Sequence, residues 1–337
     1  MDTQLFSAHE AALAGSLIRE GHLVVFPTET VYGLGADVFN EDACKHIFTA
    51  KGRPQDNPLI THIHDREQLH ALVTALPPGS QDLIRCFWPG PLTLVLPKRP
   101  DVSAVVSASL DTIGVRMPSH PVARAFLRSA GTPVAAPSAN RSGKPSPTNF
   151  AMACEAMNGR VAGILDGGAC ESGLESTVIA WDGKRWNILR PGSVTREQLA
   201  EVIEDLLEDS ILPQSDKLAV RSPGTRHPHY KPRGKVILFT DPADLTDDNL
   251  LSAGIGAENI MAVLCLSSVE AEVRRRTKAR QVYSYADWKA LARNLYSDFH
   301  RCDIEECTHI LVHTPIESTG IAEALQNRLK KAAEYTI

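Results

Sequence analysis

Cationic and hydroxyl-bearing side chains gather between residues 24 and 63, in the stretch VVFPTETVYGLGADVFNEDACKHIFTAKGRPQDNPLITHI. Lys51 and Arg53 stand close together, and Asn57 follows them in the same polar segment. Arginine and lysine side chains bind phosphate and carboxylate groups, arginine through a planar fork and lysine as a point charge. A lysine at the end of a helix also commonly does no more than complement the helix dipole. Taken singly, these residues leave both roles open.

The elements around these residues predict a pocket. The short apolar run 23–26 is typical of a buried strand, and a turn containing Gly33 and Gly35 follows it. Asn40 is a good N-cap for a helix that ends at Lys51-Gly52, and a second strand runs over 58–63. Two strands therefore carry Thr30 and His62 toward the loop of Lys51, Arg53 and Asn57.

Familiar catalytic and nucleotide-binding motifs are missing from the sequence. There is no P-loop, GxSxG or HExxH motif, and the lone Gly254-Ile255-Gly256 does not follow a strand. The remaining inventory of cations and hydroxyl groups suits catalysis by positioning and charge neutralisation. Arg274-Arg275-Arg276 is interpreted as a solvated helix face.

Six blocks together resemble the motifs of the threonylcarbamoyl-adenylate synthase family (YrdC type). They are the stretch 24–63, FWPGPLTLVL (87–96), GVRMP (114–118), SAN (138–140), LEST (174–177) and ILRPG (188–192). Their order along the chain is that of the family. The resemblance implies an α/β domain with a twisted mixed sheet curved around a concave cleft.

The reaction implied by the resemblance joins L-threonine, bicarbonate and ATP into threonylcarbamoyl-AMP and pyrophosphate. This product serves the N6-threonylcarbamoyladenosine modification of tRNA, so we expect a transient hand-over to a tRNA threonylcarbamoyl transferase. Mg²⁺ is expected to accompany ATP. Glu29, Glu175 and Asp166 could bind it, but the sequence does not select among them, and we expect no dedicated metal site.

The resemblance also implies roles for individual residues. Lys51 and Arg53 are expected to be catalytic and to lie against the ATP phosphates. The rest of the ATP site is expected to comprise Asn57, Thr112, Ser138, Asn140, Ser146, Arg190 and Tyr230. For L-threonine, the carboxylate is expected on Arg116, and the amine and hydroxyl among Thr30, His62, Ser176 and the backbone of Ala136.

Charge and composition divide the chain into three parts. Residues 1–209 form the expected catalytic domain, and 236–337 a smaller, Rossmann-like domain in which strands and helices alternate. Between them, residues 210–235 hold six Lys+Arg against one Asp+Glu and are rich in Pro and Gly. By resemblance, His229-Tyr230-Lys231-Pro232 matches a His-Tyr-Ala-Pro motif that lies across the active site, so the linker is expected to act as a lid. Lysine replaces the usual alanine.

Apolar periodicity predicts the other elements. Helices are expected at 8–20, 66–76, up to Trp88, at 121–130 and from Thr195 to Leu207, and strands at 92–96, 112–117, 133–136, 161–165, 176–181 and 186–190. In the C-terminal part, strands are expected at 236–239, 260–266, 281–283 and 308–313, with helices between them and a terminal helix.

Composition restricts the class of protein. Hydrophobic residues make up 43% and charged residues 22% of 337, which is typical of a globular chain. The seven scattered cysteines without a CxxC pair favour reduced thiols in a cytoplasmic protein. The absence of a long apolar segment argues against a membrane span or a signal peptide. A net charge of −5 argues against stable nucleic-acid binding.

Two other functions stay open on the sequence. One is a related carbamoyl-transfer enzyme acting on a different acceptor. The other is a non-enzymatic RNA-binding module.

Overall fold

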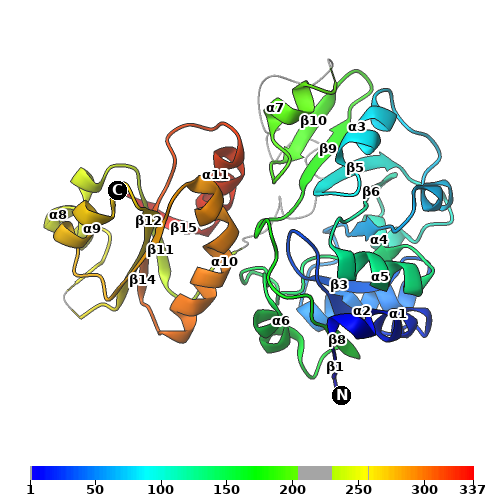
Figure 1. The fold of residues 1–337 in the computed structure, drawn as a ribbon, viewed down its shortest axis with the longest axis horizontal. Coiled ribbons are helices and arrows are strands. Elements are labelled where there is room, and N and C mark those ends of the chain that lie inside the picture. Colours follow the sequence, from blue (N-terminus) through cyan, green and yellow to red (C-terminus); the bar gives the residue numbers. More distant parts are fainter. Residues whose placement is uncertain (1, 204–229, 257) are drawn as a thin grey trace. The chain divides into compact units, whose positions relative to one another are not determined.

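The chain forms two compact units. The computed structural model describes residues 2–203, 230–256 and 258–337. The first unit comprises Met1–Ser142 with Ser146–His227, and the second comprises Gly143–Pro145 with Pro228–Ile337 (Figure 1). Most of the predicted linker 210–235 lies outside the described residues.

A mixed sheet of ten strands is the centre of the first unit. The strand order is β1-β8-β2-β3-β7-β4-β6-β5-β9-β10, and the sheet contains both parallel pairs such as β4·β6 and antiparallel pairs such as β5·β6. This confirms the predicted α/β class with a mixed sheet. The strands are β1 Gln4–Phe6, β2 Val24–Phe26, β3 Gly33–Asp37, β4 Ile60–His62, β5 Leu92–Pro97, β6 Thr112–Arg116, β7 Val134–Ala135, β8 Gly163–Leu165, β9 Thr177–Trp181 and β10 Trp186–Arg190.

Seven α-helices of the first unit are described. They are α1 Ala11–Arg19, α2 Glu41–Lys51, α3 Ser80–Phe87, α4 Ala104–Ser107, α5 Pro121–Ala130, α6 Phe150–Met157 and α7 Arg196–Ala200, with 3₁₀ turns η1 Ala8–Glu10 and η2 Arg66–Ala71. Helix α2 has the predicted ends: the Asn40 side chain accepts a hydrogen bond from Ala43 N, and Gly52 closes the helix with a φ of 61°. A left-handed residue in that place favours glycine.

The two faces of the central strands have different surroundings. Leu94, Ile113 and Val115 belong to the main hydrophobic core. Because side chains alternate along a strand, the residues next to these in each strand point to the opposite face of the sheet. Strands β4 and β6 pair Ile60 with Gly114 and His62 with Arg116. The polar side chains of His62 and Arg116 therefore share the face opposite the main core, beside a small apolar cluster of Ile60, Val95, Val178, Ala180 and Leu189.

Several elements differ from the sequence-based expectations. The predicted turn with Gly33 and Gly35 is strand β3, in which a Cβ at Gly35 would lie 2.8 Å from Val134 Cγ1. The glycines thus permit close packing of the strands, but they also remove the residue pattern from which a strand is usually predicted. The predicted helix 66–76 is only η2, and α6 was not expected although Asn149 caps it. Residues after Ile203 in the helix predicted from Thr195 lie outside the described part of the chain.

The second unit has a five-stranded parallel sheet with helices on both faces (Figure 1). Its strands are β11 Lys235–Phe239, β12 Met261–Leu266, β13 Gln281–Tyr285, β14 His309–His313 and β15 Ala333–Thr336, in the order β13-β12-β14-β11-β15. Its helices are η4 Pro242–Asp244, α8 Asp247–Ser252, α9 Glu270–Arg276, α10 Trp288–Ile304 and α11 Ile321–Ala332. Strand β15 was not expected, since only a terminal helix was. Strand β14 lies between β12 and β11, unlike the strand order of dinucleotide-binding domains.

Within the described ranges, no helix combines the length and the apolar character needed to cross a membrane.

We predict that Gly192→Ala destabilises the first unit. A Cβ at this position would lie 2.3 Å from Thr177 N and 2.5 Å from Glu175 O, which are backbone atoms that cannot turn aside. The expected loss in the free energy of unfolding is about 3 kcal/mol, the upper range for overpacking, measured by urea denaturation. The control is Gly131→Ala, with a φ of 66° and open space, where the left-handed backbone costs about 1 kcal/mol. A loss at Gly192 no larger than that of the control would contradict the packing argument.

Candidate active site

A buried lysine connects helix α2 to the loop that contains the SAN motif. Lys51, at the end of α2, is 2% exposed. Its Nζ lies 2.5 Å from Ser138 O, also donates to Asn140 O, and lies 3.4 Å from Asn140 Oδ1. All three acceptors are neutral. Burial, with a smaller effect of Arg53, holds the pKa of Lys51 well below its usual range.

The SAN loop is held in place from its other side by the segment around β3. Leu34 N donates to Pro137 O at 2.9 Å, and Ala139 N donates to Tyr32 O at 2.8 Å. Within the loop, Ser138 Oγ donates to Asn140 Oδ1 at 2.5 Å. These bonds fix the carbonyl groups that receive the Lys51 ammonium.

The loop after α2 brings two further predicted residues to this region. Arg53 Nη2 lies 3.3 Å from both Asn57 O and Pro58 O. The Asn57 side chain is buried, and its Nδ2 has no hydrogen-bond partner among the described residues. Thr112 Oγ1, at the start of β6, is also buried and likewise has no hydrogen-bond partner among the described residues. Buried polar atoms of this kind are rare in folded proteins and often mark functional sites.

Arg116 is the centre of a second polar group, at the end of β6. Its Nη2 lies 2.5 Å from Glu29 Oε1, its Nη1 donates to Thr30 Oγ1 at 2.8 Å, and its Nε donates to Gly90 O at 3.2 Å. Both charged side chains are at most 5% exposed. The guanidinium is therefore fixed in orientation, as the binding of a carboxylate requires.

His62 stands opposite Arg116 in the strand register. Its ring lies edge-on to Phe26 at 5.7 Å, and its Nδ1 has no hydrogen-bond partner within the described residues. Burial, followed by the charge of Arg116, lowers the pKa of His62 to about 3. The imidazole is thus neutral at physiological pH.

Ser176 and Arg190, predicted for different ligands, are bonded to each other. Arg190 Nη2 donates to Ser176 O at 3.0 Å and to Ser176 Oγ at 3.2 Å. The Ser176 and Thr93 hydroxyl groups are 2.8 Å apart. Nearby in the sequence, Ser146 Oγ donates to Glu175 Oε1 at 2.7 Å. The predicted Ala136 has its N–H bonded to Ile60 O at 2.8 Å, so only its carbonyl group remains for a ligand.

Thr28 and Thr93 were missed by the sequence reasoning, and Glu29 was considered only for magnesium. Thr93 interrupts the apolar run 92–96, so a buried hydroxyl in the middle of a strand was the available signal. The pairing of Glu29 with Arg116 depends on tertiary structure and had no local signal.

Tyr230 belongs to the second unit. Its backbone has a φ of 71°, its ring stacks on Tyr296 at 5.3 Å, and the Arg328 guanidinium lies 5.8 Å from its ring centre. In the same unit, Lys231 N donates to Gly143 O at 3.0 Å. A positive φ is strained for a tyrosine. His229 and the rest of the predicted lid before it lie outside the described residues.

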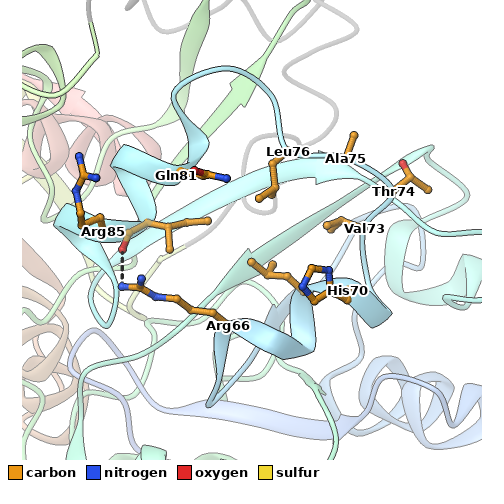
Figure 2. Close-up of a pocket in the computed structure, with 10 residues that line it drawn as sticks. Arg66, His70, Val73, Thr74, Ala75, Leu76, Gln81 and Arg85 are labelled. Carbon is orange, nitrogen blue, oxygen red and sulfur yellow. Dashed lines mark hydrogen bonds between the residues drawn. The ribbon is translucent and has the colours of Figure 1, made fainter.

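A cavity of about 620 Å³ lies elsewhere in the first unit, between η2 and α3 (Figure 2). Leu69, Val73 and Ile84 line it together with Arg66 and Arg85. Arg66 Nη2 lies 3.4 Å from Ile84 O. Because none of the sequence-predicted site residues lines it, this cavity is not the predicted substrate site.

We predict that His62 makes the protein less stable in acid. The unfolded state binds a proton near the usual histidine pKa of about 6.5, whereas the folded state binds it only near a pKa of about 3. Stability therefore falls as the pH is lowered through this window. His62→Gln should show a shallower decrease in the free energy of unfolding from pH 6.5 to pH 4, with exposed His22→Gln as the control. Parallel curves for wild type and His62→Gln would refute a buried neutral imidazole.

Comparison with known proteins identifies the family. Residues 16–192 match the family model described as "Telomere recombination" (Sua5, YciO and YrdC), and 194–334 match "Threonylcarbamoyl-AMP synthase, C-terminal domain". Threonylcarbamoyl-AMP synthase of Bacillus subtilis is 39% identical over 96% of this chain and 93% of its own, and that of Pyrococcus abyssi is 40% identical over 96% and 94%. The crystal structure of P. abyssi Sua5 complexed with L-threonine superposes with a TM-score of 0.86 over 100% of both chains, at 35% identity. The chain belongs to the Sua5 family of threonylcarbamoyl-AMP synthases.

Proposed function

We propose that this protein is an L-threonylcarbamoyladenylate synthase, which forms threonylcarbamoyl-AMP and pyrophosphate from L-threonine, bicarbonate and ATP. The observation that carries the proposal is the buried Lys51 ammonium, which donates to the neutral oxygens Ser138 O and Asn140 O and has Arg53 as a neighbour. A buried cation in such surroundings is costly without an anion. A nucleoside triphosphate supplies that anion. The relatives are named threonylcarbamoyl-AMP synthases, which indicates the reaction.

The proposed chemistry needs no covalent protein intermediate. L-threonine and bicarbonate form N-carboxythreonine and water, and the new carboxylate attacks the α-phosphorus of ATP as pyrophosphate leaves. Holding the reactants in line can supply roughly 7–11 kcal/mol of the barrier reduction. Fixed cations then offset the charge that accumulates on pyrophosphate. The protein's side chains thus contribute by positioning the reactants and by neutralising charge.

We assign the ATP phosphates to Lys51 and Arg53, the two residues with the proposed catalytic role. The other proposed nucleotide residues are Asn57, Thr112, Ser138, Asn140, Ser146 and Arg190. The unpartnered buried atoms Asn57 Nδ2 and Thr112 Oγ1 support this assignment, because a bound nucleotide would give each of them a hydrogen-bond partner.

We assign the threonine carboxylate to Arg116. Its neighbours on the same face of the sheet, His62 and Thr30, are proposed to contact the amine and hydroxyl groups, together with Ser176 and the Ala136 carbonyl group. The lowered pKa of His62 means that it contributes a hydrogen bond and no charge.

Mg²⁺ is proposed to enter with ATP. Glu29 and Glu175 are engaged by Arg116 and Ser146, and Asp166 Oδ1 accepts from Gly168 N. Mg²⁺ commonly keeps water and phosphate oxygens as most of its ligands. Carboxylates that already have protein partners are therefore consistent with a cation that arrives bound to the nucleotide. When bound, it neutralises phosphate charge.

We further propose a cytoplasmic protein that hands its product to a tRNA threonylcarbamoyl transferase without stably binding nucleic acid. The product is a mixed anhydride that water hydrolyses, which favours a transient protein contact. The net charge of −5 supports the absence of an extended RNA surface.

Arg53→Ala is predicted to abolish threonine-dependent pyrophosphate release, and Lys51→Ala to behave similarly. Arg53 lies in a loop, so its removal takes away charge but little core volume. The expected decrease in rate is at least about 100-fold, the scale of losing one electrostatic contact to a transition state. Exposed Arg160→Ala is the matched control. Near-normal turnover by folded Arg53→Ala would overturn the proposed site.

Tyr230→Phe and Tyr230→Ala test the proposed lid, formed by linker residues 210–235. The strained φ of Tyr230 and the bond from Lys231 to Gly143, close in sequence to Ser146, support this role. A lid excludes water from a hydrolysable adenylate. We expect Tyr230→Ala to shorten the lifetime of threonylcarbamoyl-AMP in the reaction mixture, followed by chromatography, and Tyr230→Phe to retain the ring stacking but lose any hydroxyl contact to ATP. An unchanged lifetime of threonylcarbamoyl-AMP in both variants would show that the linker acts only as a spacer.

A further inference from the structure

Glu29 has a carboxylate oxygen, Oε2, that has no hydrogen-bond partner among the described residues. The residue is 4% exposed, and its Oε1 lies 2.5 Å from Arg116 Nη2. Its Oε2 is buried and accepts no hydrogen bond from any described residue. A carboxylate oxygen removed from water without a donor carries a large desolvation cost. Within the described part of the chain, no donor reaches this oxygen beside Arg116.

The neighbouring hydroxyl groups have a fixed polarity. The Thr28 hydroxyl donates its only hydrogen to Val31 O at 2.6 Å. Thr28 and Thr30 hydroxyl oxygens are 2.8 Å apart, so the hydrogen between them must come from Thr30. Because Arg116 can only donate, Thr30 also accepts its bond from Nη1. Thr30 consequently has no hydrogen left for a ligand and can serve only as an acceptor.

The polar group around Arg116 thus has two distinct sides. Arg116 offers the donors that suit a carboxylate, while Glu29 Oε2 and Thr30 Oγ1 offer acceptors, one of them charged. An α-amino acid zwitterion carries the complementary pair, a carboxylate and an ammonium group with three N–H donors. His62, which lies on this face opposite Arg116 in the strand register, is neutral and adds no charge.

We propose that Glu29 recognises the α-ammonium group of L-threonine through Oε2, while its Oε1 holds Arg116 in position for the α-carboxylate. This inference rests on the proposed function and adds a substrate-binding residue to it. It also explains selection for an amino acid: a hydroxy acid of the same shape satisfies Arg116 but leaves Glu29 Oε2 buried without a donor.

The test compares two ligands that differ only in the amino group. Binding of L-threonine and of (R)-3-hydroxybutanoate, its des-amino analogue, is measured by calorimetry on the full chain. In Glu29→Gln the amide oxygen takes the place of Oε1 beside Arg116 Nη2, but the charge facing the ammonium is lost. We expect threonine affinity to fall by about 30-fold, the scale of a hydrogen bond to a charged group, and 3-hydroxybutanoate affinity to change by less than about threefold.

Two further variants keep the test decisive. Glu29→Asp retains the charge but withdraws it by one methylene group, so the preference for threonine should fall less than in Glu29→Gln; this variant decides if Glu29→Gln does not fold. Exposed Glu20→Gln is the matched control and should bind both ligands as the wild type does.

Equal losses for the two ligands would show that Glu29 acts only through Arg116 and would overturn the proposal, as would unchanged threonine binding in Glu29→Gln. Failure of the proposed function gives a different result. In that case the wild-type protein itself neither binds threonine nor releases pyrophosphate in its presence.

Discussion

The rest of the site depends on the hydrogen bonds between the Lys51 ammonium and the carbonyl groups of Ser138 and Asn140. They join the C-terminal end of α2 to the SAN loop, two segments far apart in the sequence. A cation at 2% exposure is expensive, so the surrounding structure must hold it firmly. The Asn40 cap and Gly52 fix the length of α2, and the bonds from the β3 segment fix the loop. The protein thus maintains a position for negative charge before any ligand arrives.

The strand register gives the site its second centre. Because β4 and β6 pair His62 with Arg116, both side chains stand on the face that the main core does not cover. Burial keeps the histidine neutral, whereas the arginine forms an ion pair with Glu29. The proposed phosphate end around Lys51 and the proposed amino-acid end around Arg116 are thereby formed by different elements. The reaction proposed for this fold requires that separation, since the nucleophile forms at one end and pyrophosphate leaves from the other.

Local signals predicted α2 well, because the Asn40 cap and the Lys51-Gly52 end are encoded by neighbouring residues. Strand β3 was missed because its Gly-Leu-Gly sequence suits close packing against β7 and lacks the usual strand pattern. The site residues were predicted from the family motifs, and the roles of these residues in ligand binding stay predictions. The links between them could not be predicted: the Arg190–Ser176 bonds and the Glu29–Arg116 pair arise from strand order and register, which are non-local.

The most direct test of this account follows the labelled carbon of ¹³C-bicarbonate in a reaction of the full chain with ATP and L-threonine. Mass spectrometry should detect threonylcarbamoyl-AMP that carries the label, in amounts equal to the pyrophosphate released, and only when all three substrates are present. Pyrophosphate release that does not depend on threonine, or an adenylate without the label, would contradict the central claim that the cations around Lys51 and Arg116 bring these three reactants together.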